Sequence, residues 1–322
     1  MSRPILRVEG LKVNFETSKG VSKAVDGVSF NLSKGETLGI VGESGCGKSV
    51  TALSILRLIT PPGRIVEGEV WFEDRDILAM KEEEVRAIRG KEISMIFQEP
   101  MTALNPLFKI KDQIAELCTI HSVCGREEAK ERAVDMLKRV GIADPAIRGD
   151  DYPHQLSGGM RQRVVIAMAL ALSPKVVIAD EPTTALDVTI QAQIMDLMDE
   201  LKTEFDSSLI LITHDLGLLA ESAKDIIVMY AGGVVEKGRV TDIFSKPAHP
   251  YTAGLLESIP GRGEATGGRL KTIAGSVPNL YNLPTGCRFS NRCHKAQDIC
   301  HKTIPPLEEG GEGHYAACWF AG

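Results

Sequence analysis

Short apolar runs alternate along this chain with longer segments of helical composition. The runs that predict buried strands are Thr37–Val41 (TLGIV), Val176–Ala179 and Leu209–Ile212. Ser49–Leu58 follows the first run, has the composition of a helix and ends at the turn sequence Thr60–Gly63 (TPPG). Strands that alternate with helices predict an α/β fold whose sheet is covered on both faces.

The pattern changes between Gln98 and Ser157. Asp112–Cys118 and Glu127–Val140 are charged, amphipathic and helical in period, so they predict a helical insertion in the α/β body. An insertion of about 60 residues has the size of an ordinary small subdomain.

The C-terminal part differs in composition from the rest. After about Pro247 the chain is rich in glycine and proline, and Gly261–Gly268 is predicted to be a flexible linker. The last stretch, Ile273–Gly322, has little periodicity and too few apolar residues to fold easily around a core of its own. A metal bound by its cysteines would compensate for that lack.

The overall composition is typical of a soluble globular protein. The 322 residues are 43% hydrophobic and 25% charged, with a formal net charge of -6. This length accommodates one large domain and a smaller one, or two domains. The acidic balance argues against non-specific binding of nucleic acid.

The sequence predicts neither an export signal nor a membrane span. Met1–Gly10 carries charges and lacks the apolar core of a secretory signal. The longest apolar run, Val164–Leu172, is much shorter than the ~20 residues of a membrane-spanning helix. We therefore expect any membrane role to act through partner subunits, and we expect a reducing compartment in which disulfides are disfavoured.

The segment Gly42–Ser49 (GESGCGKS) fits the phosphate-binding pattern G-x-x-x-x-G-K-[ST] and lies between a predicted strand and a predicted helix. Its glycines would let backbone N–H groups wrap the β- and γ-phosphates of a nucleotide. Lys48 would add positive charge, and the Ser49 hydroxyl would ligate Mg²⁺. The predicted ATP-binding residues here are Gly42, Glu43, Ser44, Gly45, Cys46, Gly47, Lys48, Ser49 and Val50.

A second motif ends the predicted strand Val176–Ala179 with two adjacent carboxylates. Asp180 is placed to hold Mg²⁺, and Glu181 can polarise a water molecule for attack on the γ-phosphate. An apolar run followed by Asp-Glu is on its own usually just the end of a strand. Its place downstream of a phosphate loop favours the catalytic interpretation.

A third motif, Leu156–Gly159 (LSGG), precedes a segment of helical composition, Arg161–Leu172. Ser157 is a suitable N-cap, and Gly158 and Gly159 expose backbone N–H groups. A helix N-terminus of this kind binds anions, although an ordinary capped helix has the same composition.

These motifs, in the order GESGCGKS, LSGG and VVIADEP, resemble those of the ATP-binding cassette superfamily. The resemblance implies an α/β P-loop NTPase core that binds ATP and Mg²⁺ and transfers a phosphoryl group to water. It also implies that Ser157, Gly158 and Gly159 close over the γ-phosphate held by a second ATPase subunit. The family normally has glutamine after LSGG, where this chain has Met160, but the serine and the glycines make the phosphate contact.

Further positions match the family one by one. Gln98 resembles the switch glutamine that contacts Mg²⁺ and the attacking water and relays to the membrane subunits. Asp187, in Ala185-Leu-Asp, resembles the loop that communicates across the ATPase dimer, and His214 resembles the switch histidine at the γ-phosphate. Phe15 matches the aromatic platform for adenine, with a strand-core phenylalanine as the alternative. The implied Mg²⁺ ligands are Ser49, Gln98 and Asp180, and the implied catalytic residues are Glu181, His214 and Gln98.

Three longer stretches narrow the resemblance to the ATP-binding subunits of bacterial dipeptide and oligopeptide importers. They are residues 98–106 (QEPMTALNP), 152–162 (YPHQLSGGMRQ) and 249–256 (HPYTAGLL). The branch implies two permease subunits, a second ATPase subunit that is usually a paralogue, an external solute-binding protein and attachment to the cytoplasmic face of the membrane. Nickel and sugar-oligomer importers share this branch, so uptake of nickel or oligosaccharides is the alternative.

Four of the seven cysteines cluster near the C-terminus, at Cys287, Cys293, Cys300 and Cys318. Their spacing leaves a [4Fe–4S] cluster, a zinc ion and unliganded thiols open, because the paired C-x-x-C pattern of a zinc ribbon is absent. Some relatives with this tail hold a [4Fe–4S] cluster, so the resemblance favours that cluster. These cysteines are far from the ATP motifs in sequence, so we expect the cluster to have a structural role and no redox step in hydrolysis. Cys→Ser changes should loosen the tail and weaken assembly before they alter nucleotide affinity.

The resemblance implies two domains, a nucleotide-binding domain at residues 1–260 and a cysteine-rich C-terminal domain at residues 261–322, with a helical subdomain at about residues 98–172. Two other functions fit less well. Cassette ATPases that act on DNA or ribosomes usually carry two cassettes or a long coiled-coil insertion, and this chain has one cassette. A catalytically silent partner subunit is disfavoured by the intact Glu181, His214 and LSGG.

Overall fold

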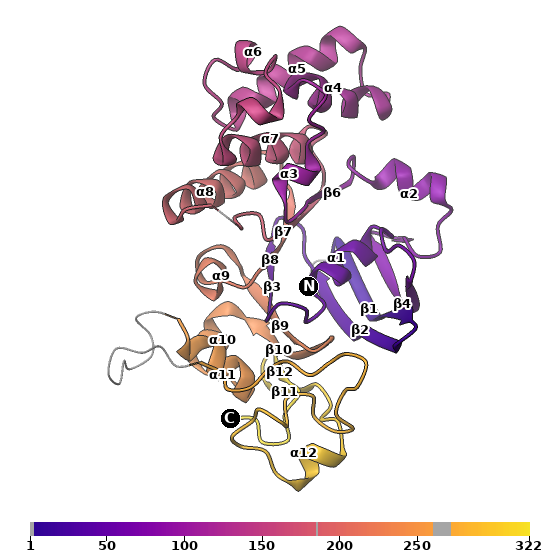
Figure 1. Cartoon of the computed structure of the whole chain (residues 1–322), viewed down its shortest axis with the longest axis vertical. Coiled ribbons are helices and arrows are strands. Elements are labelled where there is room, and N and C mark those ends of the chain that lie inside the picture. The colour runs from indigo at the N-terminus through magenta and orange to yellow at the C-terminus, as the bar shows by residue number, and fades with distance from the viewer. Residues whose placement is uncertain (1–2, 185, 260–271) are drawn as a thin grey trace. The chain divides into compact units, whose positions relative to one another are not determined.

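A computed structural model describes residues 3–184, 186–259 and 272–322 of the chain, shown in Figure 1. The chain divides into two compact units. Unit 1 comprises residues 1–33, 37–79 and 211–322, and unit 2 comprises residues 34–36 and 80–210. The predicted linker Gly261–Gly268 lies outside the described residues, as does Ala185.

An antiparallel sheet near the N-terminus forms one part of unit 1 (Figure 1). It has the strand order β2-β1-β4-β5. Side chains of β1 are buried at Leu6, Val8, Leu11 and Val13, and an irregularity in the pairing between Val8 and Leu11 changes which alternate positions are buried. The bounds are Leu6–Thr17 (β1), Gly20–Leu32 (β2), Gly63–Phe72 (β4) and Arg75–Asp76 (β5).

The strand that leads into the phosphate-loop region and four strands from the C-terminal part of the chain form the other sheet of unit 1. β3 pairs in parallel with β9, and β10 pairs with β9 and β12 in antiparallel fashion. All residues of β3 are buried, as its continuous apolar run predicts. The bounds are Thr37–Val41 (β3), Asp225–Tyr230 (β9), Gly233–Arg239 (β10), Glu308–Gly311 (β11) and His314–Ala316 (β12).

The helices of unit 1 are short. α1 begins at Lys48, within the phosphate-binding segment, and α9 begins after His214. The bounds are Lys48–Ile55 (α1), Leu216–Ser222 (α9), Val240–Ser245 (α10), Pro250–Glu257 (α11) and Asp298–Lys302 (α12).

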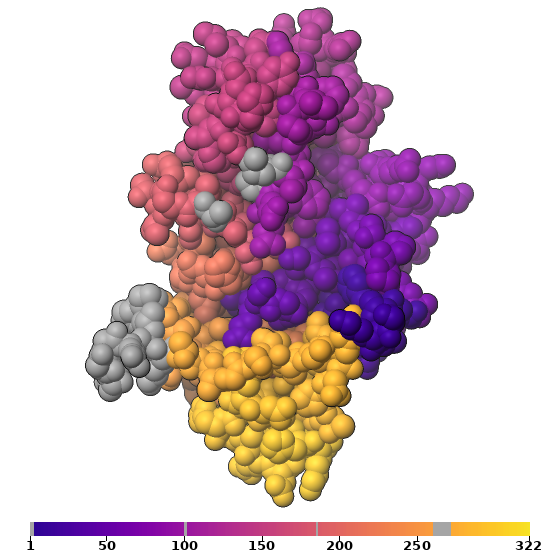
Figure 2. Space-filling model, in the orientation of Figure 1, coloured from indigo at the N-terminus to yellow at the C-terminus, as the bar shows by residue number. Residues whose placement is uncertain are grey.

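The cysteine-rich tail packs on the body of unit 1 instead of forming a core of its own. The buried ring of Phe289 lies 5.3 Å from the ring of Tyr230, edge to face, and 5.4 Å from the ring of Tyr251. β11 and β12 extend the sheet from the edge of β10. In Figure 2 the orange and yellow surface of this tail adjoins the indigo surface of the first strands. The tail has few apolar residues, and it packs those it has against apolar side chains from earlier parts of the chain.

Unit 2 contains two parallel strands and a group of helices. β6 pairs in parallel with β7, and α7 contacts α3, α4 and α5. The predicted helical segments are confirmed as α4 and α5. Ion pairs at i,i+4 spacing, Glu128 with Arg132 and Asp135 with Arg139, support the exposed face of α5. The bounds are Glu82–Ile88 (α2), Ile93–Ile96 (β6), Pro100–Ala103 (α3), Ile110–Ile120 (α4), Arg126–Arg139 (α5), Pro145–Arg148 (α6), Pro153–Gln155 (η1), Gly158–Leu170 (α7), Val176–Asp180 (β7) and Val188–Glu204 (α8).

The three buried strands predicted from apolar runs are confirmed as β3, β7 and β8, the last at Ser208–Thr213. β8 contains the boundary between the two units, at Ile210 and Leu211. Over the part of the chain that the structure describes, none of the helices has the length and apolar character needed to cross a bilayer.

Candidate functional site

The phosphate-binding pattern forms a glycine-rich turn between β3 and α1 in unit 1. Gly42 has φ +158° and Gly47 has φ +105°, which side-chain-bearing residues rarely adopt. A Cβ atom at Gly42 would lie 2.2 Å from the carbonyl oxygen of Met229, and one at Gly47 would lie 2.3 Å from that of Ala24. The two glycines therefore allow the loop to lie directly against neighbouring backbone.

Lys48 begins helix α1 and its ammonium group folds back into the loop. Its Nζ donates to the carbonyl oxygen of Gly42 at 2.7 Å and to that of Glu43 at 3.3 Å. The first turn of a helix leaves backbone N–H groups without intrahelical partners, so Lys48 and the start of α1 both present donors to an anion. Cys46 is fully buried, and burial raises the pKa of its thiol.

Glu43 connects the phosphate loop to two later parts of unit 1. Its backbone N–H donates to the hydroxyl of Tyr251, in α11, at 2.9 Å. Its carboxylate accepts two hydrogen bonds from the guanidinium of Arg292, which lies in the cysteine-rich tail. The hydrogen bonds with Glu43 raise the pKa of Arg292 further above its usual range.

His214 follows β8 and its side chain is exposed. The next residue, Asp215, accepts a hydrogen bond from the backbone N–H of Gly217 at 2.8 Å and so caps α9. The backbone N–H of Asp215 donates to the hydroxyl of Thr213 at 3.0 Å. These bonds hold the turn that carries His214.

Phe15 lies in β1 of unit 1, opposite Ser22 of β2 and Gly63 of β4. Its side chain is half-buried. A Cβ atom at Gly63 would lie 2.6 Å from the Phe15 ring, so this glycine allows the ring to pack over the backbone of β4. The geometry is compatible with both the adenine platform and the strand-core alternative.

The two adjacent carboxylates lie at the end of β7 in unit 2. Asp180 is the last residue of the strand and is 4% exposed. Glu181 is half-buried and has φ +47°, a left-handed conformation that is unfavourable for a residue with a side chain. Such strain is concentrated at functional sites, where the surrounding structure maintains it.

Two side chains hold the carboxylate of Glu181. Gln98 donates from its amide nitrogen to Glu181 Oε2 at 3.1 Å, and the hydroxyl of Thr184 donates to the same oxygen at 2.8 Å. The structure thus brings together Gln98 and Glu181, both of which the sequence analysis identified. Thr184 was not identified, because a threonine in a turn carries no signal of its own.

The LSGG segment forms the exposed N-terminus of α7. Ser157 accepts a hydrogen bond from the backbone N–H of Met160 at 3.3 Å, as predicted for an N-cap. Gly159 lies next to α8, because a Cβ atom there would be 3.1 Å from Ile190. Asp187 is the N-cap of α8 and accepts from the backbone N–H of Ile190 at 2.9 Å. Asp187 therefore has at least a structural role.

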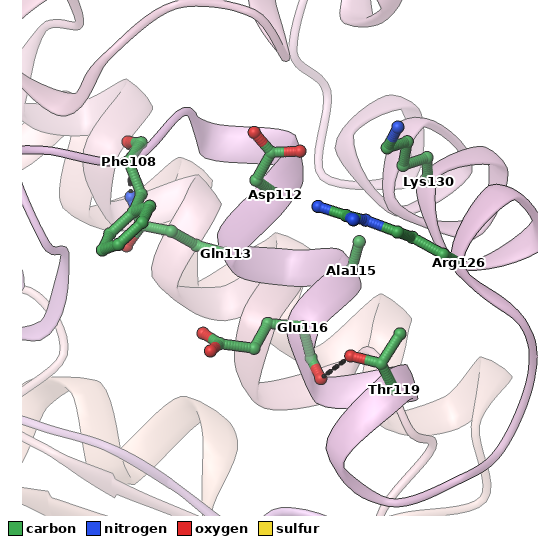
Figure 3. A pocket seen from close by; sticks show the side chains of 8 residues that line it. All are labelled: Phe108, Asp112, Gln113, Ala115, Glu116, Thr119, Arg126 and Lys130. Atoms are coloured by element: carbon green, nitrogen blue, oxygen red, sulfur yellow. Dashed lines mark hydrogen bonds between the residues drawn. The ribbon is translucent and has the colours of Figure 1, made fainter.

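A cavity of about 590 Å³ lies between α4 and α5 of unit 2 (Figure 3). Asp112 and Glu116 of α4 contribute negative charge to its lining, and Arg126 and Lys130 of α5 contribute positive charge. Phe108 lines it from the segment before α4. The sequence analysis did not identify this cavity, since it depends on how two amphipathic helices pack.

The four C-terminal cysteines converge. Cys287, Cys293, Cys300 and Cys318 all line one small cavity, together with aromatic side chains that include Phe289. Burial raises the pKa of the thiols of Cys287, Cys293 and Cys318. The residues fit a four-thiolate site in number and kind, although no group of three or more ligands has metal-binding geometry within residues 3–184, 186–259 and 272–322.

Two family models match the chain. The one described as ABC transporter matches residues 25–184, and the one described as oligopeptide/dipeptide transporter, C-terminal region, matches residues 235–300. The chain is 51% identical over 316 residues to a probable peptide ABC transporter ATP-binding protein of Sinorhizobium fredii, with 98% of this chain and 94% of the relative covered. It is 51% identical over 317 residues to the oligopeptide transport ATP-binding protein OppD of Bacillus subtilis, with 98% and 88% covered.

Solved structures give a similar result. One is a dimeric ATP-binding cassette in a post-hydrolysis state bound to ADP and Pi, with a TM-score of 0.66, 28% sequence identity, and 73% of this chain and 98% of that chain covered. Another is cbiO1 of Clostridium perfringens, described as part of an ABC transporter complex, with a TM-score of 0.63, 29% identity, and 75% and 91% covered.

Proposed function

Because the chain belongs to the ATP-binding subunits of ABC transporters, we propose that it binds and hydrolyses ATP to energise uptake of dipeptides or oligopeptides. Its fold is the P-loop NTPase fold of ABC ATPases, with α/β sheets. The observation that carries the catalytic proposal is the carboxylate of Glu181, which follows a buried strand and is oriented by Gln98 and Thr184.

In unit 1, residues 42–50 are the proposed binding segment for the triphosphate. Lys48 pairs with the β- and γ-phosphates, and backbone N–H groups at the start of α1 donate to their oxygens. Ser49 ligates Mg²⁺, His214 contacts the γ-phosphate, and Phe15 stacks on adenine. Lys48 is nearly fully buried, and its ammonium group bonds to the carbonyl oxygens of Gly42 and Glu43 and to the Cys46 thiol. Phosphate oxygens would be stronger acceptors for it.

In unit 2, Asp180 and Gln98 are the proposed Mg²⁺ ligands and Glu181 is the general base. Glu181 takes a proton from water as the water oxygen attacks the γ-phosphorus, and the bond from that phosphorus to the β–γ bridging oxygen breaks. The products are ADP and inorganic phosphate. Bound Mg²⁺ would neutralise charge on the phosphate oxygens.

The LSGG segment of this chain is the proposed contact for the γ-phosphate of the ATP that a second ATPase subunit binds. Ser157 and Gly158 are exposed at the N-terminus of α7, which supports a role toward a separate molecule. Asp187 is the proposed contact loop between the subunits. The proposed second subunit is a paralogue of this chain, as the resemblance to peptide importers favours.

Permease subunits are the proposed partners of the helical part of unit 2, at about residues 98–172. Leu107 is 79% exposed and Phe108 is 56% exposed, and both precede α4. Gln113 fixes this apolar segment, since its side chain bonds to the backbone of Asn105 and to the carbonyl oxygen of Phe108. A fixed, exposed apolar segment next to the cavity in Figure 3 suits a permease helix. This docking would attach the chain to the cytoplasmic face of the membrane.

The proposed transported solute is a peptide, chosen by the permeases and an external solute-binding protein. The match of residues 235–300 to the oligopeptide/dipeptide transporter C-terminal region supports it. Nickel or oligosaccharide uptake is the alternative that the branch allows. Transport of labelled peptides into vesicles that contain the assembled complex would distinguish these solutes.

The C-terminal domain, at residues 261–322, is the proposed site of a [4Fe–4S] cluster. Convergence of four thiols on one cavity supports it. The cluster, when bound, would link the segments that carry Cys287, Cys293, Cys300 and Cys318 through iron–sulfur bonds. The buried thiols must lose their protons to ligate, so binding of the cluster would overcome their raised pKa.

The direct test of ATP binding uses the full chain with Mg²⁺ and a fluorescent ATP analogue. Lys48→Ala should weaken binding strongly, because it removes the positive charge from the phosphate site. Equal affinity of Lys48→Ala and the unchanged chain would contradict the proposed nucleotide site.

A further inference from the structure

Arg292 lies in the cysteine-rich tail, yet its guanidinium forms a two-pronged ion pair with Glu43 of the phosphate loop. The hydrogen bonds are 2.6 Å and 3.0 Å long, one to each carboxylate oxygen. Only 5% of the Arg292 side chain and 27% of the Glu43 side chain are exposed. A bidentate and largely enclosed pair of this kind is stronger and more directional than an ordinary surface ion pair.

The remaining N–H groups of Arg292 are also bonded. Its Nε donates to the carbonyl oxygen of Ala274 at 2.9 Å, one terminal nitrogen donates to that of Ile273 at 3.2 Å, and the other donates to the hydroxyl of Tyr230 at 3.3 Å. All five guanidinium donors therefore have an acceptor. The position of Arg292 is thus fixed by the tail and by β9 as well as by the phosphate loop.

Glu43 is in turn close to the proposed phosphate-binding groups. Its carbonyl oxygen accepts from the ammonium of Lys48 at 3.3 Å, and its N–H donates to the buried hydroxyl of Tyr251. The phosphate-binding pattern leaves this position unspecified, so it does not itself require a carboxylate here. An uncompensated carboxylate at the loop would repel the triphosphate of ATP.

We propose that Arg292 is a positioning residue for nucleotide binding: it neutralises Glu43 and fixes its side chain, so that the phosphate loop binds ATP more tightly while the cysteine-rich tail is docked. This inference rests on the proposed ATP site at residues 42–50. If the proposal holds, the tail contributes to ATP affinity although Arg292 lies 249 positions after Glu43 in the chain.

Other contacts of the tail reach β1, β2 and the residue that follows β9. Arg288 pairs with Asp26 of β2 and donates to the carbonyl oxygen of Ala231 at 2.6 Å. The hydroxyl of Tyr281 accepts from Thr17 of β1 at 3.1 Å. Because alternate residues of a strand share a face, Thr17 lies on the same face of β1 as Phe15, the proposed adenine platform. Undocking of the tail would therefore disturb both ends of the proposed nucleotide site.

The test is a binding measurement on the full chain with Mg²⁺ and the fluorescent analogues mant-ATP and mant-ADP. Arg292→Gln should raise the Kd for mant-ATP about tenfold, because it leaves Glu43 negative and unpaired. The rise should be smaller for mant-ADP, which carries less negative charge. Glu43→Gln combined with Arg292→Gln should recover most of the affinity, since the repelling carboxylate is then absent. Arg292→Lys should retain part of the affinity because it retains the charge.

Lys302→Gln is the matched control, since it removes one positive charge from an exposed position at the end of α12 in the same tail. It should bind both nucleotides as the unchanged chain does. Unchanged affinity of Arg292→Gln, or a double variant as weak as Arg292→Gln alone, would overturn the inference. If the unchanged chain and Lys48→Ala bind mant-ATP equally, the proposed ATP site itself fails, which is a separate result.

Discussion

The side-chain amide of Gln98 donates a 3.1 Å hydrogen bond to the carboxylate of Glu181, although the residues are 83 positions apart in the chain. Gln98 follows β6 and Glu181 follows β7, and these two strands pair in parallel. Parallel pairing places the carboxyl ends of both strands at the same edge of the sheet, which is where α/β folds bind ligands. The same carboxylate accepts from Thr184, so its orientation is set before any nucleotide binds.

Glu181→Gln should preserve MgATP binding and lower the rate of hydrolysis by ~10²–10⁴-fold. The amide has the shape of the carboxylate but cannot accept a proton from water. Steady-state ATPase assays of the assembled transporter measure the rate, with the second subunit's own site disabled so that only this site is observed. Unchanged turnover would contradict the assignment of Glu181 as the base.

Thr184→Val should lower the hydrolysis rate about tenfold while the affinity for ATP stays the same. Valine has nearly the same shape but cannot donate to the carboxylate of Glu181, so the carboxylate loses the hydrogen bond from Thr184. Thr184→Ser retains the hydroxyl and is the matched control. An equal loss of rate in both variants would show that packing, and not the hydrogen bond, is responsible.

Ser157→Arg and Gly158→Asp should leave ATP binding to this chain intact and abolish ATP hydrolysis by the assembled pair. Both residues are exposed, and a Cβ atom at Gly158 would meet its nearest neighbour, Leu186, at an ordinary 3.9 Å, so neither change disturbs the core. The LSGG segment contacts the nucleotide of the other subunit, so the defect is a failure of the two subunits to close. Loss of nucleotide binding as severe as that of Lys48→Ala would rule out the head-to-tail arrangement.

Anaerobically purified protein should be brown and contain iron and sulfide at about four each per chain. Cys293→Ser should loosen the tail, and because Cys293 adjoins Arg292 it should also weaken ATP binding. The separation in sequence led to the opposite expectation, that nucleotide affinity is affected last. Colourless protein with one zinc ion, or with no metal, would exclude the cluster and leave the ATPase function intact.

His249→Asn should make the stability of the chain less dependent on pH. Burial lowers the pKa of His249 from 6.5 to about 4. The unfolded chain therefore binds a proton here below about 6.5, and the folded chain does so only below about 4. The stability contributed at this site is complete above pH 6.5, falls between pH 6.5 and 4, and is constant below, a loss of up to about 3 kcal/mol.

Asparagine retains an acceptor for the backbone N–H of Tyr251, to which His249 Nδ1 bonds at 3.0 Å, so the N-cap of α11 is preserved. The buried carboxylate of Glu236 accepts from the backbone N–H groups of Ala248 and His249 at this turn. Denaturant unfolding at pH 7.5 and pH 5 measures the difference. An equal decrease in stability for the variant and the unchanged chain would show that other groups account for it.

The sequence by itself determined the elements that carry the chemistry. The apolar runs at Thr37–Val41 and Val176–Ala179 are buried strands, as expected of continuous apolar runs too short for a helix and bounded by turn residues. The glycines of the phosphate loop and the N-cap serine of LSGG follow from local backbone requirements, which the chain encodes within a few residues. Local rules of this kind need no knowledge of the rest of the fold.

The tertiary structure alone decided which distant side chains meet. Thr184 is adjacent to Glu181 in a turn whose conformation, with φ +47° at Glu181, no propensity predicts. Arg292 reaches Glu43 across 249 positions of sequence because the tail lacks a core and packs its Phe289 against Tyr230 and Tyr251. Long-range contacts depend on how whole elements pack, and the residues that form them carry no periodic or motif signal that a reading along the chain could detect.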